Sequence, residues 1–106
     1  MSDWIVAADV AALEPGDVRV VDADGTAIAV FNVAGEYFAL EDVCTHDGGQ
    51  LTGGCIEGAE VVCPRHGARF SIRSGEALTP PAYEPTSVFP VRIEDGKVLV
   101  RDDRWD

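Results

Sequence analysis

Glycine turn signals recur along this chain between short apolar runs, and they limit the folds that it can adopt. Asp-Gly is the strongest of these hairpin signals, because both residues tolerate the positive φ angles that a two-residue turn requires. Closely spaced turns favour antiparallel strands. The sequence therefore predicts a small all-β domain, an antiparallel β-sandwich or barrel. The signals are Asp24-Gly25, Ala34-Gly35, Glu57-Gly58, Ser74-Gly75 and Asp95-Gly96.

Strands are expected on either side of these turns. Residues 26–31 form a nearly continuous apolar run, which is typical of a buried strand. Phe89, Val91 and Ile93 alternate with proline or charged positions, which predicts one half-buried strand of period two. Further strands are predicted at 18–21, 37–40, 59–62, 69–72 and 98–101.

Helix is expected only near the N-terminus. Asp9 is placed to cap a short helical segment over residues 10–13. Pro15-Gly16 would keep this segment to about two turns at most. Two segments, 42–54 and 63–68, interrupt the strand pattern with glycine, proline and polar residues. A length of 106 residues predicts a single domain over residues 1–106.

Charge and hydropathy exclude two classes of function. The formal net charge is -11, so the chain should repel nucleic acid. No apolar run approaches the roughly 20 residues that a membrane span needs. The N-terminal residues Met1-Ser2-Asp3-Trp4 do not resemble a secretory signal, so we expect a cytoplasmic protein.

The residues suited to bind a metal lie in the two interruptions. The first contains Cys44-Thr45-His46, and the second contains Cys63-Pro64-Arg65-His66-Gly67, with sixteen residues between His46 and Cys63. Each loop therefore offers one thiolate and one imidazole, and the chain has no other histidine. The strands between the loops can bring them face to face, which predicts one metal centre with mixed ligands.

Two Cys and two His are also compatible with a redox-inert structural zinc site. Zinc motifs usually pair like with like, as in C-x2-C followed by H-x3-5-H, whereas here each loop mixes the two ligand types. Cys55, the third cysteine, lies outside the pattern and is expected to serve as a small apolar side chain in a hairpin.

The pattern C-T-H followed by C-P-x-H-G resembles the Rieske two-iron two-sulfur motif. The resemblance implies one 2Fe-2S cluster, with Cys44 and Cys63 on one iron and His46 and His66 on the other. It also implies a Rieske-type fold with a small cluster-binding subdomain over about 42–82. In this family a proline loop, matched here by Pro80-Pro81, covers the cluster.

Departures from the family pattern indicate the subclass. High-potential Rieske proteins carry a disulfide at the positions of Gly49 and Arg65, and serine and tyrosine hydroxyls at those of Ala68 and Phe70. With fewer hydrogen bonds to the cluster, the potential should lie at the low end of the Rieske range, roughly -150 mV. The chain thus resembles a Rieske-type ferredoxin of multicomponent aromatic-ring oxygenases.

The resemblance implies an electron carrier and not an enzyme. A monomeric carrier would accept single electrons from a flavin-containing, NAD(P)H-dependent ferredoxin reductase and pass them to a terminal Rieske oxygenase with a mononuclear iron. A small subunit of an assimilatory nitrite reductase, which shares the fold, is a second hypothesis. The zinc module is the third.

Three further expectations concern residues around the loops. Gly48, Gly49 and Gly67 should let backbone N–H groups approach the cluster sulfurs, which would raise the potential. Arginines 65, 69 and 73 either lie on a solvated loop face or form a positive collar near the cluster on an acidic body. Glu41, Asp42 and Asp47 are expected to be solvated, and residues 101–106 carry no signal.

Overall fold

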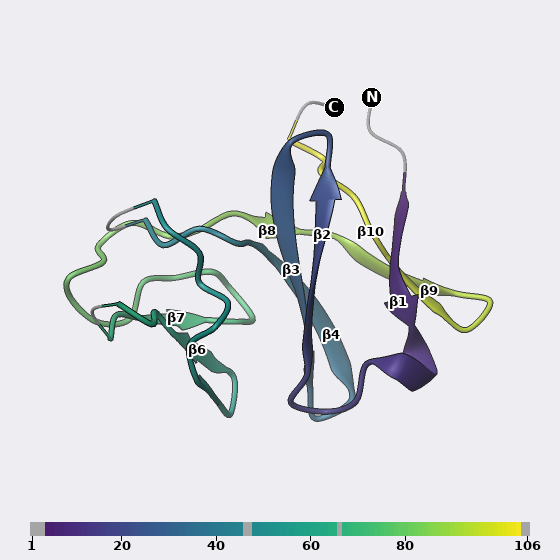
Figure 1. Ribbon diagram of the computed structural model, residues 1–106, viewed down its shortest axis with the longest axis horizontal. Helices are drawn as coiled ribbons and strands as arrows, with labels where there is room; N and C mark the ends of the chain where they lie inside the picture. The colour runs from purple at the N-terminus through teal and green to yellow at the C-terminus, as the bar shows by residue number, and fades with distance from the viewer. Residues whose placement is uncertain (1–3, 46–47, 66, 105–106) are drawn as a thin grey trace.

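The computed structural model describes residues 4–45, 48–65 and 67–104 (Figure 1). These residues form an all-β fold of three antiparallel sheets, which confirms the predicted fold class. No helix among them has the length and apolar character needed to cross a membrane. The strands are β1 Ile5–Asp9, β2 Val18–Ala23, β3 Thr26–Val33, β4 Glu36–Glu41, β5 Ile56–Glu57, β6 Glu60–Val62, β7 Arg69–Ser71, β8 Val88–Phe89, β9 Val91–Glu94 and β10 Lys97–Val100.

The central sheet has the strand order β2-β3-β4-β8 and is built on two tight turns. Asp24 and Ala34 lie in the left-handed region, with φ of 52° for each, and glycine follows each of them. These turns place Ala23 opposite Thr26 and Val33 opposite Glu36. The hairpins predicted from Asp24-Gly25 and Ala34-Gly35 are therefore confirmed.

Strand β3 is buried on both faces, which explains its nearly continuous apolar sequence. Because successive side chains of a strand point to opposite faces, its residues divide between two cores. Ile28 and Val30 pack with residues of β1 and β10 in one core. Ala29 and Phe31 pack in a second core that also contains Cys44 and Cys63. The central sheet thus lies between an outer sheet and the cysteine-containing segments.

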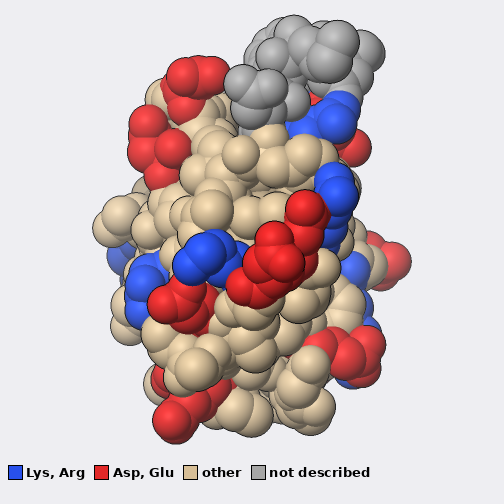
Figure 2. Space-filling view, turned by 90° about the vertical axis from the view of Figure 1, so that its right-hand side faces the viewer, with Lys and Arg blue, Asp and Glu red and all other residues tan. Residues whose placement is uncertain are grey.

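The outer sheet has the order β1-β10-β9 and joins the two ends of the chain. Ile5 pairs with Val100 and Asp9 with Lys97. Strand β1 was not predicted, because its partner β10 lies at the far end of the sequence. On this side of the molecule basic and acidic side chains are interspersed (Figure 2), and the Lys97 ammonium lies 2.9 Å from the Asp9 carboxylate.

The prediction of a single half-buried strand over 89–94 is wrong. Phe89 ends β8, which pairs with β4 in the central sheet, whereas Val91 begins β9, which pairs with β10 in the outer sheet. Pro90 lies between them and has no N–H to continue either ladder. Because the chain changes sheets here, Ile93 is 50% exposed and does not share a buried face with Phe89.

The helix prediction near the N-terminus is also corrected. The helical segment is a 3-10 turn of three residues, Val10–Ala12, and it is shorter than the expected 10–13. The side chain of Asp9 makes no capping hydrogen bond, and its carboxylate instead accepts a hydrogen bond from Lys97. The cross-strand ion pair has replaced the local cap.

The third sheet, β5-β6-β7, is small and lies at the side of the molecule opposite β9 (Figure 1). Its central strand pairs Val61 with Ile56 on one side and with Phe70 on the other. Val61 and Phe70 are almost fully buried in the same core as Cys44 and Cys63. This sheet therefore carries the second cysteine-containing segment against the face of β3 and β4.

Candidate metal centre

Cys44 and Cys63 lie in one buried cluster, although nineteen positions separate them in the sequence. Their exposed fractions are 0% and 1%. Cys44 follows the end of β4, and Cys63 follows the end of β6. We call residues 44–49 the first cysteine loop and residues 63–68 the second. His46, Asp47 and His66, which the sequence analysis assigned to these loops, lie outside the described residues.

The first cysteine loop is closed by two backbone hydrogen bonds. The N–H of Cys44 donates to the carbonyl oxygen of Gly49 over 2.7 Å, and the N–H of Gly48 donates to the carbonyl oxygen of Cys44 over 2.7 Å. Gly48 has a φ of 76°, a left-handed conformation that favours glycine. The loop thus turns back tightly behind the buried cysteine.

The second cysteine loop repeats this pattern at the same spacing. The N–H of Cys63 donates to the carbonyl oxygen of Ala68 over 2.7 Å, and the N–H of Gly67 donates to the carbonyl oxygen of Cys63 over 3.1 Å. Gly67 has a φ of 73°, which matches Gly48. The N–H groups of Gly48 and Gly67 therefore donate to carbonyl oxygens of their own loops. These glycines form the turn. The approach of backbone N–H groups at Gly48, Gly49 and Gly67 to the cluster sulfurs stays a prediction.

A buried carboxylate holds the base of the first loop. Asp42 is 5% exposed. Its Oδ1 accepts hydrogen bonds from the N–H groups of Leu51 and Thr52, both over 2.9 Å. Its Oδ2 accepts one from the Thr52 hydroxyl over 2.7 Å. The expectation of a solvated carboxylate at Asp42 is therefore wrong, because this side chain satisfies backbone donors that the loop leaves unpaired.

The two cysteine loops face each other, as the sequence predicted. The guanidinium of Arg65, in the second loop, lies against Gly49 in the first, where a Cβ would be 2.6 Å from the Arg65 Cζ. Arg65 Nη2 also lies 3.4 Å from the Sγ of Cys63, within hydrogen-bond distance for a sulfur acceptor. The loops therefore meet at an arginine–glycine contact beside one of the buried thiols.

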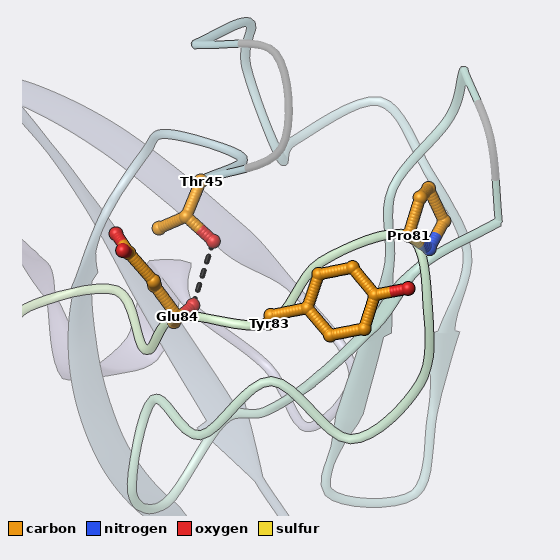
Figure 3. A pocket seen from close by; sticks show the side chains of 4 residues that line it. All are labelled: Thr45, Pro81, Tyr83 and Glu84. Atoms are coloured by element: carbon orange, nitrogen blue, oxygen red, sulfur yellow. Dashed lines mark hydrogen bonds between the residues drawn. The ribbon is translucent and has the colours of Figure 1, made fainter.

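The proline loop, residues 79–86, lies against the first cysteine loop (Figure 3). The hydroxyl of Thr45 donates a hydrogen bond to the carbonyl oxygen of Glu84 over 2.6 Å. Thr45, Pro81, Tyr83 and Glu84 line a pocket at this junction. Tyr83 is 80% exposed. The residue between Cys44 and His46 is thus connected directly to the proline loop.

Side chains behind the cysteines are apolar, as the family departures implied. Ala68 and Phe70 have exposed fractions of 0%. Neither side chain has a donor for a sulfur atom. The third thiol differs from its prediction: Cys55 is exposed and does not belong to either core, because it precedes β5 at the outer edge of the small sheet.

The positive collar is not supported at two of its three arginines. Arg69 pairs with Glu57 over 2.9 Å and with Glu60 over 3.3 Å. Arg73 pairs with Glu36 over 3.3 Å and lies 5.0 Å from the ring centroid of Phe38. Their charges are compensated by carboxylates of neighbouring strands. Arg65 alone of the three contacts a cysteine sulfur among the described residues.

The C-terminal segment, which carried no sequence signal, stabilises the strand that leads into the first cysteine loop. Arg104 Nε donates to the buried carboxylate of Asp102 over 2.9 Å, and Arg104 Nη1 donates to Glu41 over 3.0 Å. The guanidinium also bonds Thr26 over 3.1 Å and lies 5.0 Å from the ring centroid of Phe89. Hydrogen bonds from Arg104 lower the pKa of Asp102 to about 2. Glu41 at the end of β4 is thereby held in place.

The donor set suits a soft metal centre. Two buried thiols on facing loops, with no room for a Cβ at Gly49 and a cationic donor on one sulfur, fit an iron–sulfur cluster held by thiolates. Both thiols lie in one buried cluster on loops that face each other, so they are placed to act together as ligands of one centre.

Comparisons with known proteins agree with this geometry. A family model described as the Rieske [2Fe-2S] domain matches residues 3–90. The chain is 36% identical to the ferredoxin component of the naphthalene 1,2-dioxygenase/salicylate 5-hydroxylase systems of Ralstonia sp., over 93% of this chain and 95% of that protein. It is 44% identical to the biphenyl dioxygenase ferredoxin subunit of Pseudomonas sp. strain KKS102, over 81% of this chain and 80% of that protein.

A solved structure shows the same fold. A chain in the complex of reduced oxygenase and oxidized ferredoxin in carbazole 1,9a-dioxygenase superposes with a TM-score of 0.89. The sequences are 32% identical, and the match covers 94% of each chain. The similarity therefore extends over both cysteine loops and the three sheets.

Proposed function

This chain belongs to the Rieske [2Fe-2S] domain family, as a ferredoxin of the kind found in aromatic-ring dioxygenase systems, and we propose that Cys44, His46, Cys63 and His66 hold its cluster. Family membership implies one 2Fe-2S cluster in place of zinc. The buried, facing positions of Cys44 and Cys63 support the thiolate half of this ligand set. The cluster, when bound, accepts and releases one electron.

The observation that carries the proposal is the matched pair of cysteine loops in one core. The same backbone pattern closes both loops, and residues of β3 and β4 pack in the same core as both cysteines. A site held on packed elements changes geometry little when its charge changes, which favours fast electron transfer. The protein residues keep water from the sulfurs and hold the loops at a fixed separation.

The partners follow from the relatives. Ferredoxin components of naphthalene and biphenyl dioxygenase systems are matched over most of their length, and a similar ferredoxin is in complex with an oxygenase. We therefore propose that this chain receives electrons from a flavin-dependent NAD(P)H ferredoxin reductase and delivers them to a terminal Rieske oxygenase. These relatives favour the dioxygenase-type carrier over a nitrite reductase subunit.

Three further properties belong to the same proposal. The carrier acts as a monomer, and it functions in the cytoplasm, where such electron-transfer systems have access to NAD(P)H. Residues 1–106 form one domain, in which about 42–82 make the cluster-binding part. The small sheet β5-β6-β7 and both cysteine loops lie within that range, which supports the assignment.

The decisive experiment is an EPR spectrum of the dithionite-reduced protein with a redox titration of the same sample. We expect a rhombic signal typical of mixed Cys and His ligation and a midpoint potential near the low end of the Rieske range, roughly -150 mV. His46→Cys and His66→Cys variants should change the signal toward that of all-cysteine clusters. A colourless protein with stoichiometric zinc after anaerobic purification would contradict the proposal.

A second measurement tests the carrier role. Reduced protein mixed with a terminal oxygenase of an aromatic-ring dioxygenase system should be reoxidised in a concentration-dependent manner, followed by its visible absorbance. As a comparison, the same reduced protein is mixed with the catalytic subunit of a nitrite reductase, which should not reoxidise it. If only the nitrite reductase subunit reoxidised the protein, the dioxygenase assignment would be wrong, whereas the assignment of a 2Fe-2S cluster would remain valid.

A further inference from the structure

The contact between Arg65 and Gly49 requires that position 49 have no side chain. A Cβ at Gly49 would lie 2.6 Å from Cζ, 2.7 Å from Nη2 and 2.9 Å from Nε of Arg65. All three distances are below those that real Cβ atoms adopt. Gly49, unlike Gly48, does not have a left-handed φ. A Cβ at position 49 would therefore force the flexible end of Arg65 to move away, whereas the backbone conformation does not restrict this position to glycine.

The same guanidinium approaches a ligand atom. Arg65 Nη2 lies 3.4 Å from the Sγ of Cys63, and the Sγ belongs to a residue that is 1% exposed. A hydrogen bond from a charged donor to a thiolate is stronger than one from a neutral donor, because charge and dipole act together. The planar group thus contacts the first loop with one side and the second loop's sulfur with one edge.

We propose that Arg65 is a positioning residue that joins the two cysteine loops through Gly49 and raises the reduction potential through the sulfur of Cys63. This inference rests on the proposed function, because it takes Cys63 as a cluster ligand. Reduction adds one negative charge to the cluster. Hydrogen bonds to the sulfurs and a nearby cation favour that charge, so they shift the potential upward.

The neighbouring arginines do not take this role. Arg69 is paired with Glu57 and Glu60, and Arg73 is paired with Glu36. Removing the charge of Arg73 changes the net charge as much as removing that of Arg65 but leaves the sulfur contact unchanged. Arg73→Gln is therefore the matched control that separates a specific contact from a general effect of charge.

The test is a redox titration of the cluster-loaded protein in four variants, with EPR spectra of the same samples. Arg65→Met removes every donor and should shift the midpoint potential to more negative values. Gly49→Ala should displace the guanidinium and shift it in the same direction. Arg65→Lys keeps the charge without the planar fork, so its potential should lie between wild type and Arg65→Met. Arg73→Gln should stay close to wild type.

A double variant tests whether the two residues act together. If Gly49 acts through Arg65, adding Gly49→Ala to Arg65→Met should produce no further shift in potential. Loss of visible absorbance in mild denaturant should be severalfold faster in Arg65→Met than in Arg73→Gln, because the loops have lost their contact. The rate of absorbance loss therefore tests whether Arg65 holds the two cysteine loops together, independently of its effect on the reduction potential.

Three outcomes overturn the inference, and they can be distinguished from one another. Unchanged potentials in Arg65→Met and Gly49→Ala, in samples that keep the rhombic signal, would exclude the proposed role of Arg65 and leave the proposed function intact. Equal shifts in Arg65→Met and Arg73→Gln would assign the effect to net charge alone. Absence of the rhombic signal in the wild-type protein would instead refute the proposed function, and this inference with it.

Discussion

The hydroxyl of Thr45 donates a hydrogen bond to the carbonyl oxygen of Glu84, and the 2.6 Å contact joins segments thirty-nine positions apart. Thr45 follows Cys44 directly, and Glu84 lies in the proline loop beside Pro81 and Tyr83 (Figure 3). The Thr86 hydroxyl adds a second bond, donating to the carbonyl oxygen of Glu41 over 3.0 Å. The proline loop is therefore attached to the first cysteine loop and to the strand that precedes it.

Thr45→Val should loosen the proline loop. The substitution keeps the shape of the side chain but removes the donor, and a typical hydrogen bond contributes about 1 kcal/mol. We expect a lower midpoint concentration for unfolding by guanidinium chloride and faster loss of the cluster's visible absorbance in air. Thr45→Ser retains the hydroxyl and should behave like wild type. Equal rates of absorbance loss in the two variants would show that this bond does not hold the loop.

Asp42→Ala should destabilise the protein more strongly than Thr45→Val does. It leaves the N–H groups of Leu51 and Thr52 without their acceptor, and Leu51 is fully buried. Two unsatisfied donors should cost about 2–4 kcal/mol in the free energy of unfolding. Asp42→Asn is the matched control, because its amide oxygen can accept both N–H bonds and its NH2 can donate to the Thr52 hydroxyl. The Asn variant should lose only about 1 kcal/mol by chemical denaturation; an Asn variant as unstable as the Ala variant would argue against this account.

Gly54→Ala should disturb the packing of the chain around Gly54 against Val62 and Pro64, at the start of the second cysteine loop. A Cβ at Gly54 would collide with the backbone carbonyl of Val62 and come within 3.2 Å of the Pro64 Cδ. Backbone cannot move aside as a flexible side chain can, so we expect a loss of about 1–3 kcal/mol and poorer cluster incorporation. Gly58→Asn is the control, since Gly58 has open space and a φ of 60° that asparagine tolerates. Iron content per protein and the unfolding midpoint measure both effects.

The Asp102–Arg104 pair should make stability depend on pH in acid. Hydrogen bonds from Arg104 lower the folded-state pKa of Asp102 to about 2, against an ordinary value of 3.8. The folded state therefore favours the ionised carboxylate. Its contribution is complete above the unfolded pKa and is lost as the pH falls from about 4 toward 2.

Arg104→Gln removes the cause of that shift. The difference in urea midpoint between wild type and Arg104→Gln should be constant from pH 7 to about 5 and should shrink below pH 4. Taking the difference cancels the effects of acid on the rest of the protein, including the cluster. A difference that persists unchanged to pH 2 would show that Asp102 is not the group responsible.

Local signals account for what the sequence predicted well. The Asp24-Gly25 and Ala34-Gly35 turns require only the conformational preferences of two adjacent residues, and both predicted hairpins form. The cysteine pattern is similarly local, because each pair of ligand candidates lies within one short loop. The prediction that the two loops face each other followed from the short strands between them.

Contacts between distant segments account for what was missed. Strand β1 depends on β10 at the other end of the chain, and the role of Asp9 was altered by Lys97 on that strand. The alternation over 89–93 was real, but Pro90 lies where the chain passes from one sheet to another. Likewise, the sequence left open whether Arg69 and Arg73 lie on a solvated loop face or form part of a positive collar, and carboxylates on other strands compensate their charge.

The sequence specified a pattern of two cysteines and two histidines without any structure, because ligand type and loop spacing are properties of residues close together in the chain. It also determined the all-β class through its turns. Contacts formed on folding determine which groups support the site: the buried Asp42 beneath the first cysteine loop, the exposed Arg65 against Gly49, and the exposed Arg104 on Glu41 at the end of β4. Such contacts depend on which surfaces come together when three sheets pack, and a charged side chain in a sequence does not reveal which partner, solvent or protein, will face it.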